Sequence, residues 1–259
     1  MGGSAGDLHP RRQREGRPRN PEGLPQEARR AGAGSAGGHV SAPAAVIFDN
    51  DGLTLDTEGL WTLAEERLFA RYDTEFTAAH KLELLGKSGL LAGRFLSEEL
   101  GLPESAGLRL VGEMDELVFE AMEEGLSPMP GAVELLAALE EAGIPRGLCS
   151  NSPRPFVERA TARAGVADSF QVMVTGDDVE NGKPEPDPYL ETARLLGVDP
   201  ADCVALEDSP PGAMSAHRAG MDVLVVPSFE GLDYEGAEDA RFGSLADPGL
   251  WERLGLQPA

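Results

Sequence analysis

The stretch AVIFDNDG, residues 45–52, decides the fold of this 259-residue chain. Its first four residues are apolar, and three are β-branched or aromatic, which favours a short buried strand. Gly52 then permits a sharp turn out of the strand. Because residues i and i+2 of an extended segment point the same way, Asp49 and Asp51 should face one site. Such a pair is more often part of a turn than a site, so the rest of the chain must decide its meaning.

Apolar spacing of three and four residues predicts helices directly after this strand. The expected ranges are 58–72, 77–85, 89–100 and 104–125. We therefore expect an all-helical insertion over residues 58–127.

From residue 130 onward, helical and strand patterns alternate, with glycines closing the helices. Strands are predicted at 144–149, 171–175, 203–206 and 223–226, and helices at 131–143, 153–164, 188–196 and 211–219. Single helices between strands predict an α/β fold with a Rossmann-like parallel sheet and right-handed crossovers. Residues 228–259 read as an irregular end with one helix at 248–254.

Composition sets the first 43 residues apart from the rest of the chain. Residues 1–43 are rich in Arg, Gly and Pro and poor in large apolar side chains, which predicts a disordered tail. The patterns above assign residues 44–57 and 128–259 to the α/β core and residues 58–127 to the helical insertion.

Bulk properties narrow the function. The formal net charge of −23 disfavours nucleic acid and anionic membrane surfaces as partners. No apolar run reaches the roughly 18 residues of a membrane span. Two cysteines do not form a disulfide framework, which indicates a reducing compartment. We expect a cytoplasmic monomer or weak dimer that acts on a small metabolite.

Polar residues follow each predicted strand. Asp49 and Asp51 follow the first, Ser150 and Asn151 the second, Lys183 lies a few residues after the third, and Glu207 with Asp208 the fourth. Ligands of open parallel sheets bind beyond the carboxyl ends of the strands. These residues should therefore converge on one site.

The residue types at this site suit phosphoryl transfer. Asp49 can attack phosphorus to give an aspartyl-phosphate, and Asp51 can pass a proton to the leaving oxygen. Glu207 and Asp208 would complete a carboxylate cluster for Mg²⁺. Ser150 offers a hydroxyl and backbone amides to a phosphoryl oxygen. Lys183 is one of only three lysines beside 19 arginines, which suggests that an ammonium is needed there.

Four segments together carry a family resemblance. FDNDGLTLDTE (48–58), LCSNS (148–152), GKPEPDPYL (182–190) and LEDSPPGAMSAHRAGM (206–221) resemble the four motifs of the haloacid dehalogenase superfamily of phosphohydrolases, in order. The helical insertion resembles the small cap of the branch that contains sugar-phosphate phosphatases and β-phosphoglucomutase.

The resemblance implies a role for each matching residue. Asp49 would be the nucleophile and Asp51 the acid/base. Mg²⁺ would be held by Asp49, the backbone carbonyl of Asp51 and Asp208, with Glu207 assisting. Ser150 and Asn151 would bind the phosphoryl group, and Lys183 would bridge it to Asp49. In the cap, Trp61, Gly86, Lys87 and Ser88 are the candidates that contact substrate, although Trp61 could equally be cap core.

Three alternatives remain beside a Mg²⁺-dependent phosphatase acting on a small phosphomonoester such as a sugar phosphate. A β-phosphoglucomutase-like mutase is disfavoured, because Trp61 stands where such enzymes have a hinge His and Gly89 where they have a cap Arg. A receiver-type switch phosphorylated on Asp is disfavoured by the order of Lys183 and the acidic pair. A binding protein without catalysis is disfavoured because every catalytic position is occupied.

Overall fold

The computed structural model describes residues 42–85, 87–123 and 125–257. The predicted disordered tail, residues 1–43, lies almost wholly outside the described residues. Within those residues, no helix combines the length and apolar character that crossing a bilayer requires.

A six-stranded parallel sheet forms the centre of the described chain. Its strands are β1 (Ala45–Asp49), β2 (Arg146–Cys149), β3 (Val172–Val174), β4 (Cys203–Glu207), β5 (Asp222–Val225) and β6 (Ala240–Arg241). Their spatial order is β3-β2-β1-β4-β5-β6, and every neighbouring pair is parallel. The predicted α/β fold class and its parallel sheet are thereby confirmed.

Strand β1 lies inside the sheet, and all five of its residues are buried. Val46 and Phe48 pack into one apolar cluster, whereas Ala45 and Ile47 pack into a second. This alternation explains why the strand is apolar throughout, since both of its faces are covered.

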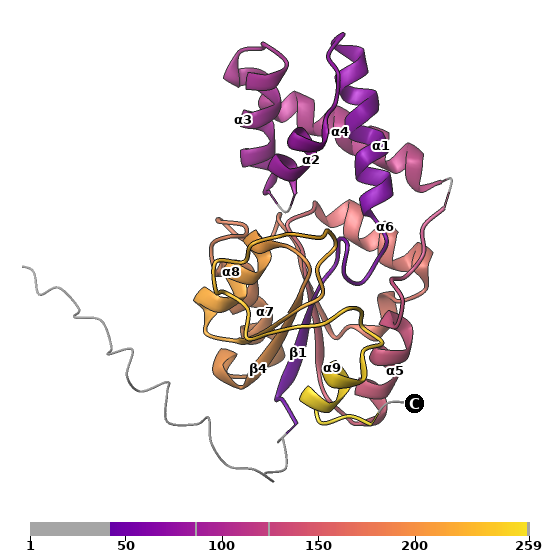
Figure 1. Cartoon of the computed structure of the whole chain (residues 1–259), viewed down its shortest axis with the longest axis vertical. Coiled ribbons are helices and arrows are strands. Elements are labelled where there is room, and N and C mark those ends of the chain that lie inside the picture. The colour runs from indigo at the N-terminus through magenta and orange to yellow at the C-terminus, as the bar shows by residue number, and fades with distance from the viewer. Residues whose placement is uncertain (1–41, 86, 124, 258–259) are drawn as a thin grey trace, which may run out of the picture. The chain divides into compact units, whose positions relative to one another are not determined.

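Helices cover both faces of the sheet (Figure 1). The helices α5 (Ala132–Glu141), α6 (Arg154–Ala164) and α9 (Pro248–Arg253) contribute to the first cluster, and α7 (Asp187–Leu196) and α8 (Pro210–Ala219) to the second. All five agree with the predicted helices to within two residues at each end.

The predicted helical insertion is also present. It comprises α1 (Glu58–Arg71), α2 (Ala78–Leu84), α3 (Gly89–Glu99), a short 3₁₀ helix, η2 (Glu104–Ala106), and α4 (Gly107–Met122). Figure 1 shows these helices together at the top of the view. A Cβ on Gly93 would lie 2.9 Å from backbone atoms of Gly107, so α3 and α4 approach closely because both residues lack one.

Two predictions for local structure were wrong. The single helix expected over 104–125 is split into η2 and α4 and ends at Met122. Residues 228–247, expected to be irregular, contain β6 and the buried Tyr234. A two-residue edge strand carries too little sequence pattern to be recognised.

Candidate active site

The first strand delivers Asp49 to the carboxyl edge of the sheet, where the chain turns sharply. Gly52 has a φ of 81°, a left-handed conformation that favours glycine. A Cβ at Gly52 would lie 2.5 Å from Oδ2 of Asp208 and 3.4 Å from Cγ of Glu58. The turn therefore requires glycine for two reasons, its backbone conformation and the close approach of these side chains.

Lys183 is buried between carboxylates of two neighbouring strands. Its Nζ donates to Oδ1 of Asp49 at 2.5 Å, to Oε1 of Glu207 at 2.6 Å and to the carbonyl of Cys149 at 3.1 Å. Burial alone would lower the pKa of this ammonium, but Asp49 and Glu207 outweigh it and hold the pKa well above its ordinary value. The lysine is thus a fixed positive charge beside Asp49.

Glu207 uses both carboxylate oxygens inside the protein. Oε1 accepts from Lys183 and from the hydroxyl of Tyr189 at 2.7 Å. Oε2 accepts from the amide of Asp208 at 3.1 Å and from the amide and hydroxyl of Ser209. Glu207 therefore holds Lys183 in place from within the core.

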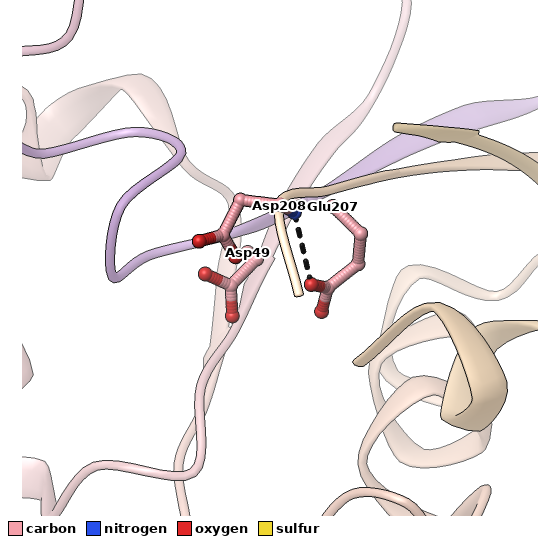
Figure 2. Close-up of side chains that lie close together, drawn as sticks. All are labelled: Asp49, Glu207 and Asp208. Carbon is pink, nitrogen blue, oxygen red and sulfur yellow. Dashed lines mark hydrogen bonds between the residues drawn. The ribbon is translucent and has the colours of Figure 1, made fainter. Parts of the chain in front are cut away.

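Asp49, Glu207 and Asp208 form a buried carboxylate cluster. One oxygen of each lies within 4.8 Å of the others. Figure 2 shows the three side chains, with Glu207 engaged by the Asp208 amide. Burial first, and the neighbouring carboxylates second, raise the pKa of Asp208 well above its ordinary value. Burial likewise raises the pKa of Asp49, with Lys183 opposing it.

This cluster fits a divalent cation. Three carboxylates face one ammonium, so a further positive charge would stabilise their ionised forms. Oδ2 of Asp208 is buried and has no hydrogen-bond partner among the described residues, which leaves it available as a ligand. All of these donors are oxygens, which Mg²⁺ prefers. Asp49 and Asp208 are the better-placed ligands, because the oxygens of Glu207 are already engaged.

Asp51 is held by four hydroxyl or indole donors. Its Oδ1 accepts from Thr57 at 3.0 Å and Trp61 at 3.1 Å, and its Oδ2 accepts from Ser150 and Ser152 at 2.9 Å each. The structure thus brings Asp51 and Ser150 into direct contact.

One detail of the Ser150 prediction was wrong. Its amide donates to the carbonyl of Val174 at 2.9 Å and is not free for a phosphoryl oxygen. The cause is the parallel pairing of neighbouring strands, which continues for one residue beyond β2. Asn151 lies against the lysine loop: its side chain accepts from the Lys183 amide at 2.8 Å and donates to the Lys183 carbonyl at 3.1 Å.

A cavity of ≈ 780 Å³ lies above these groups, lined by Asp49, Asp51, Asn151, Lys183 and Asp208 together with residues of α1–α4. Trp61, Lys87 and Ser88, three of the predicted substrate contacts, line it too. Trp61 also packs on Phe156, with ring centroids 5.0 Å apart. Phe156 belongs to α6, outside residues 58–127, so this contact does not place Trp61 in the core of the cap. Gly86, the fourth, lies outside the described residues.

Several residues at the site were not predicted from the sequence. Tyr189 supports Glu207, and the hydroxyl of Tyr234 donates to the carbonyl of Asp208. Glu58, Glu65 and Lys81 line the cavity from the helical insertion. The rarity of lysine in the sequence, which singled out Lys183, applies equally to Lys81 and could have identified it.

A parallel sheet that presents carboxylates and one buried lysine at its carboxyl edge suits phosphoryl transfer to an aspartate. Residues 43–220 match the family model of the haloacid dehalogenase-like hydrolases. The chain belongs to this family.

Two similar proteins of Arabidopsis thaliana carry phosphatase names. The chain is 33% identical over 222 residues to the bifunctional riboflavin kinase/FMN phosphatase, covering 82% of this chain and 56% of that protein. It thus spans little more than half of the bifunctional relative. It is 34% identical over 225 residues to (DL)-glycerol-3-phosphatase 1, mitochondrial, covering 82% of this chain and 71% of that protein.

A solved structure has a similar fold. The crystal structure of CbbY from Rhodobacter sphaeroides in complex with phosphate has a TM-score of 0.70 and 29% identity to this chain. The match covers 80% of this chain and 96% of that one.

Proposed function

We propose that this enzyme is a Mg²⁺-dependent phosphatase that hydrolyses a small phosphomonoester, a sugar phosphate first among them, through an aspartyl-phosphate on Asp49. The observation that carries the proposal is the 2.5 Å contact between Nζ of Lys183 and Oδ1 of Asp49, which are 134 positions apart in the chain. The phosphatase names of the relatives and the phosphate bound in CbbY support the substrate class.

The roles follow from position. Asp49 attacks phosphorus, and the bond from phosphorus to the leaving oxygen breaks as Asp51 donates a proton to that oxygen. Asp51 then takes a proton from water, whose oxygen attacks phosphorus and releases Asp49. Lys183 balances the charge on the equatorial oxygens, with Ser150 and Asn151 beside them.

Asp49, Asp208 and the backbone carbonyl of Asp51 would hold Mg²⁺, with Glu207 fixing Lys183 beside them. The ion would supply positive charge for the transferring phosphoryl group.

The helical insertion would act as the cap that selects the leaving group, with residues 44–57 and 128–259 as the core and 58–127 as the cap. Trp61, Lys87 and Gly86 are its proposed substrate contacts. We also place the enzyme in the cytoplasm, because Cys149 and Cys203 are both buried free thiols.

The test is phosphate release from a panel of phosphorylated metabolites, with Mg²⁺ and after chelation. We expect multiple turnovers with Mg²⁺, and a loss of about 10³-fold or more in Asp49→Asn. Asp56→Asn, a matched exposed aspartate, should retain activity. Slow autophosphorylation without steady phosphate release would instead indicate a receiver-type switch, and isomerised sugar phosphate without release a mutase.

A further inference from the structure

All three lysines of this chain line the same cavity. Lys183 lies at its base, and Lys81 and Lys87 lie on the helical insertion. The 19 arginines lie elsewhere or outside the described residues, since no arginine is among the described lining residues. Each lysine of the chain, with its compact ammonium and three donors, thus lies at this cavity.

Lys81 is engaged by two glutamates of α1. Its Nζ lies 2.9 Å from Oε2 of Glu58 and 3.1 Å from Oε2 of Glu65. The side chains of Lys81 and Glu65 are only 11% and 5% exposed. Burying such a group is costly compared with apolar residues of the same size, so a purely structural use is a poor explanation.

Glu58, Lys81 and Glu65, here called the triad, line the same cavity as the catalytic residues. The missing side chain of Gly52 leaves room for Glu58 on one side and Asp208 on the other. A substrate whose phosphorus lies beside Asp49 would therefore extend towards Glu58 and Lys81.

The charge of the cavity opposes a second anion. Glu58, Lys81 and Glu65 together carry a net charge of −1 when both carboxyls are ionised. Nζ of Lys87 lies 3.0 Å from Oε2 of Glu83. Among the described lining residues of the helical insertion, both cations are thus already matched by carboxylates.

Lys81 and the two glutamates can instead form hydrogen bonds with the hydroxyl groups of a substrate. An ammonium with two of its three donors engaged retains one, and the carboxylates retain acceptor lone pairs. Each hydroxyl both donates and accepts. Burial raises the pKa of Glu65 to about 7 against the opposing effect of Lys81, so near neutral pH this carboxyl can also donate.

We propose that Glu58, Lys81 and Glu65 form the specificity site of the enzyme. This site binds the hydroxyl groups of a polyol monophosphate whose leaving group carries no charge of its own. It disfavours substrates that carry a second phosphate or a carboxylate. This inference rests on the proposed phosphatase function.

The experiment compares three substrates: sorbitol 6-phosphate, p-nitrophenyl phosphate, whose leaving group has no hydroxyl, and fructose 1,6-bisphosphate. For the wild type we expect kcat/KM for sorbitol 6-phosphate to exceed that for the bisphosphate by about tenfold or more. In Lys81→Met/Glu65→Leu, kcat/KM for sorbitol 6-phosphate should fall by about tenfold or more, and that for p-nitrophenyl phosphate should stay within about twofold. Glu65→Leu alone, which keeps the ion pair of Lys81 with Glu58, should show the same selective loss, and it serves if the double variant does not fold.

The matched control is Arg94→Met/Glu104→Leu, which removes an exposed ion pair of the same insertion away from the cavity. It should leave all three kcat/KM values unchanged. Equal losses on all substrates in the triad variants, or no loss on any, would overturn the specificity site while leaving the phosphatase proposal intact. A wild type that releases phosphate from no monoester overturns the phosphatase proposal itself, and the inference with it.

Discussion

The hydroxyl of Tyr189 donates a 2.7 Å hydrogen bond to the carboxylate of Glu207, and both side chains are fully buried. Glu207 in turn accepts from Lys183, whose Nζ lies 5.0 Å from the centroid of the Tyr189 ring. The position of the ammonium beside Asp49 thus depends on a tyrosine of α7 that cannot itself reach the cavity.

Replacing Tyr189 with Phe should weaken the enzyme without abolishing it. The variant keeps the ring beneath Lys183 but leaves one acceptor of Glu207 short of a partner. We expect a loss of about 1–3 kcal/mol in the free energy of unfolding, measured by urea denaturation. We also expect a several-fold lower kcat with little change in KM. Tyr72→Phe, which removes a partly exposed hydroxyl bonded to Glu113, is the control and should change both quantities little. An unchanged unfolding free energy in Tyr189→Phe would contradict the assigned hydrogen bond.

The sheet could be predicted from sequence because its signals are local. The four apolar residues before Asp49 mark the first strand. Glycines that close the helices mark the later βα units. Neither signal depends on the rest of the chain. The convergence of Asp49, Asp208 and Lys183 then follows, because the ends of parallel strands lie at one edge.

The supporting contacts could not be predicted in this way. Tyr189 reaches Glu207 from α7, and Tyr234 reaches the carbonyl of Asp208 from a segment that carries little periodicity. Lys81 of α2 meets Glu65 of α1 only in the folded insertion, and no local pattern encodes that contact. Contacts between elements depend on how helices pack, and the spacing of residues along one helix does not report it.

Asp208→Asn should separate metal binding from folding. In the wild type, Mg²⁺ at 100 times its Kd should stabilise the fold by about 2.7 kcal/mol, measured as a thermal shift, because the ion binds only the folded state. The variant should show a much smaller shift. Without Mg²⁺ it should be at least as stable as the wild type, because one buried, mutually repelling carboxylate has been removed. Asp202→Asn, an exposed aspartate just before the other end of β4, should respond to Mg²⁺ like the wild type. An equal Mg²⁺ shift in Asp208→Asn would place the ion elsewhere.

Gly212→Ala should disturb the site from α8. A Cβ on Gly212 would overlap the carboxylate oxygens of Glu207, which are fully buried and engaged by Lys183. We expect a loss of about 1–3 kcal/mol in unfolding free energy, as for other overpacked sites, together with a lower kcat. Gly112→Ala is the matched control, because Gly112 lies inside α4 and an added Cβ would meet no other described atom within 4 Å beyond its neighbours in the helix backbone. That variant should gain about 0.5–1 kcal/mol from helix propensity. If both variants gained stability alike, the close approach of Gly212 and Glu207 would be refuted.

Glu65 should make the stability of the protein depend on pH in a definite direction. Burial raises the pKa of its carboxyl from 4.5 to about 7, although Lys81 opposes the shift. Between these values the folded protein keeps a proton that the unfolded chain has lost, so the free energy of unfolding falls as the pH rises from about 4.5 to about 7.

Glu65→Gln should remove this slope, because the amide does not titrate. Relative to the wild type, the variant should therefore gain on the order of 2 kcal/mol as the pH rises across that window. Urea denaturation at pH 5, 6, 7 and 8 measures the difference, with Glu104→Gln as the exposed control, which should run parallel to the wild type. Parallel curves for Glu65→Gln and the wild type would show that the carboxyl keeps an ordinary pKa, and that Lys81 fully offsets its burial.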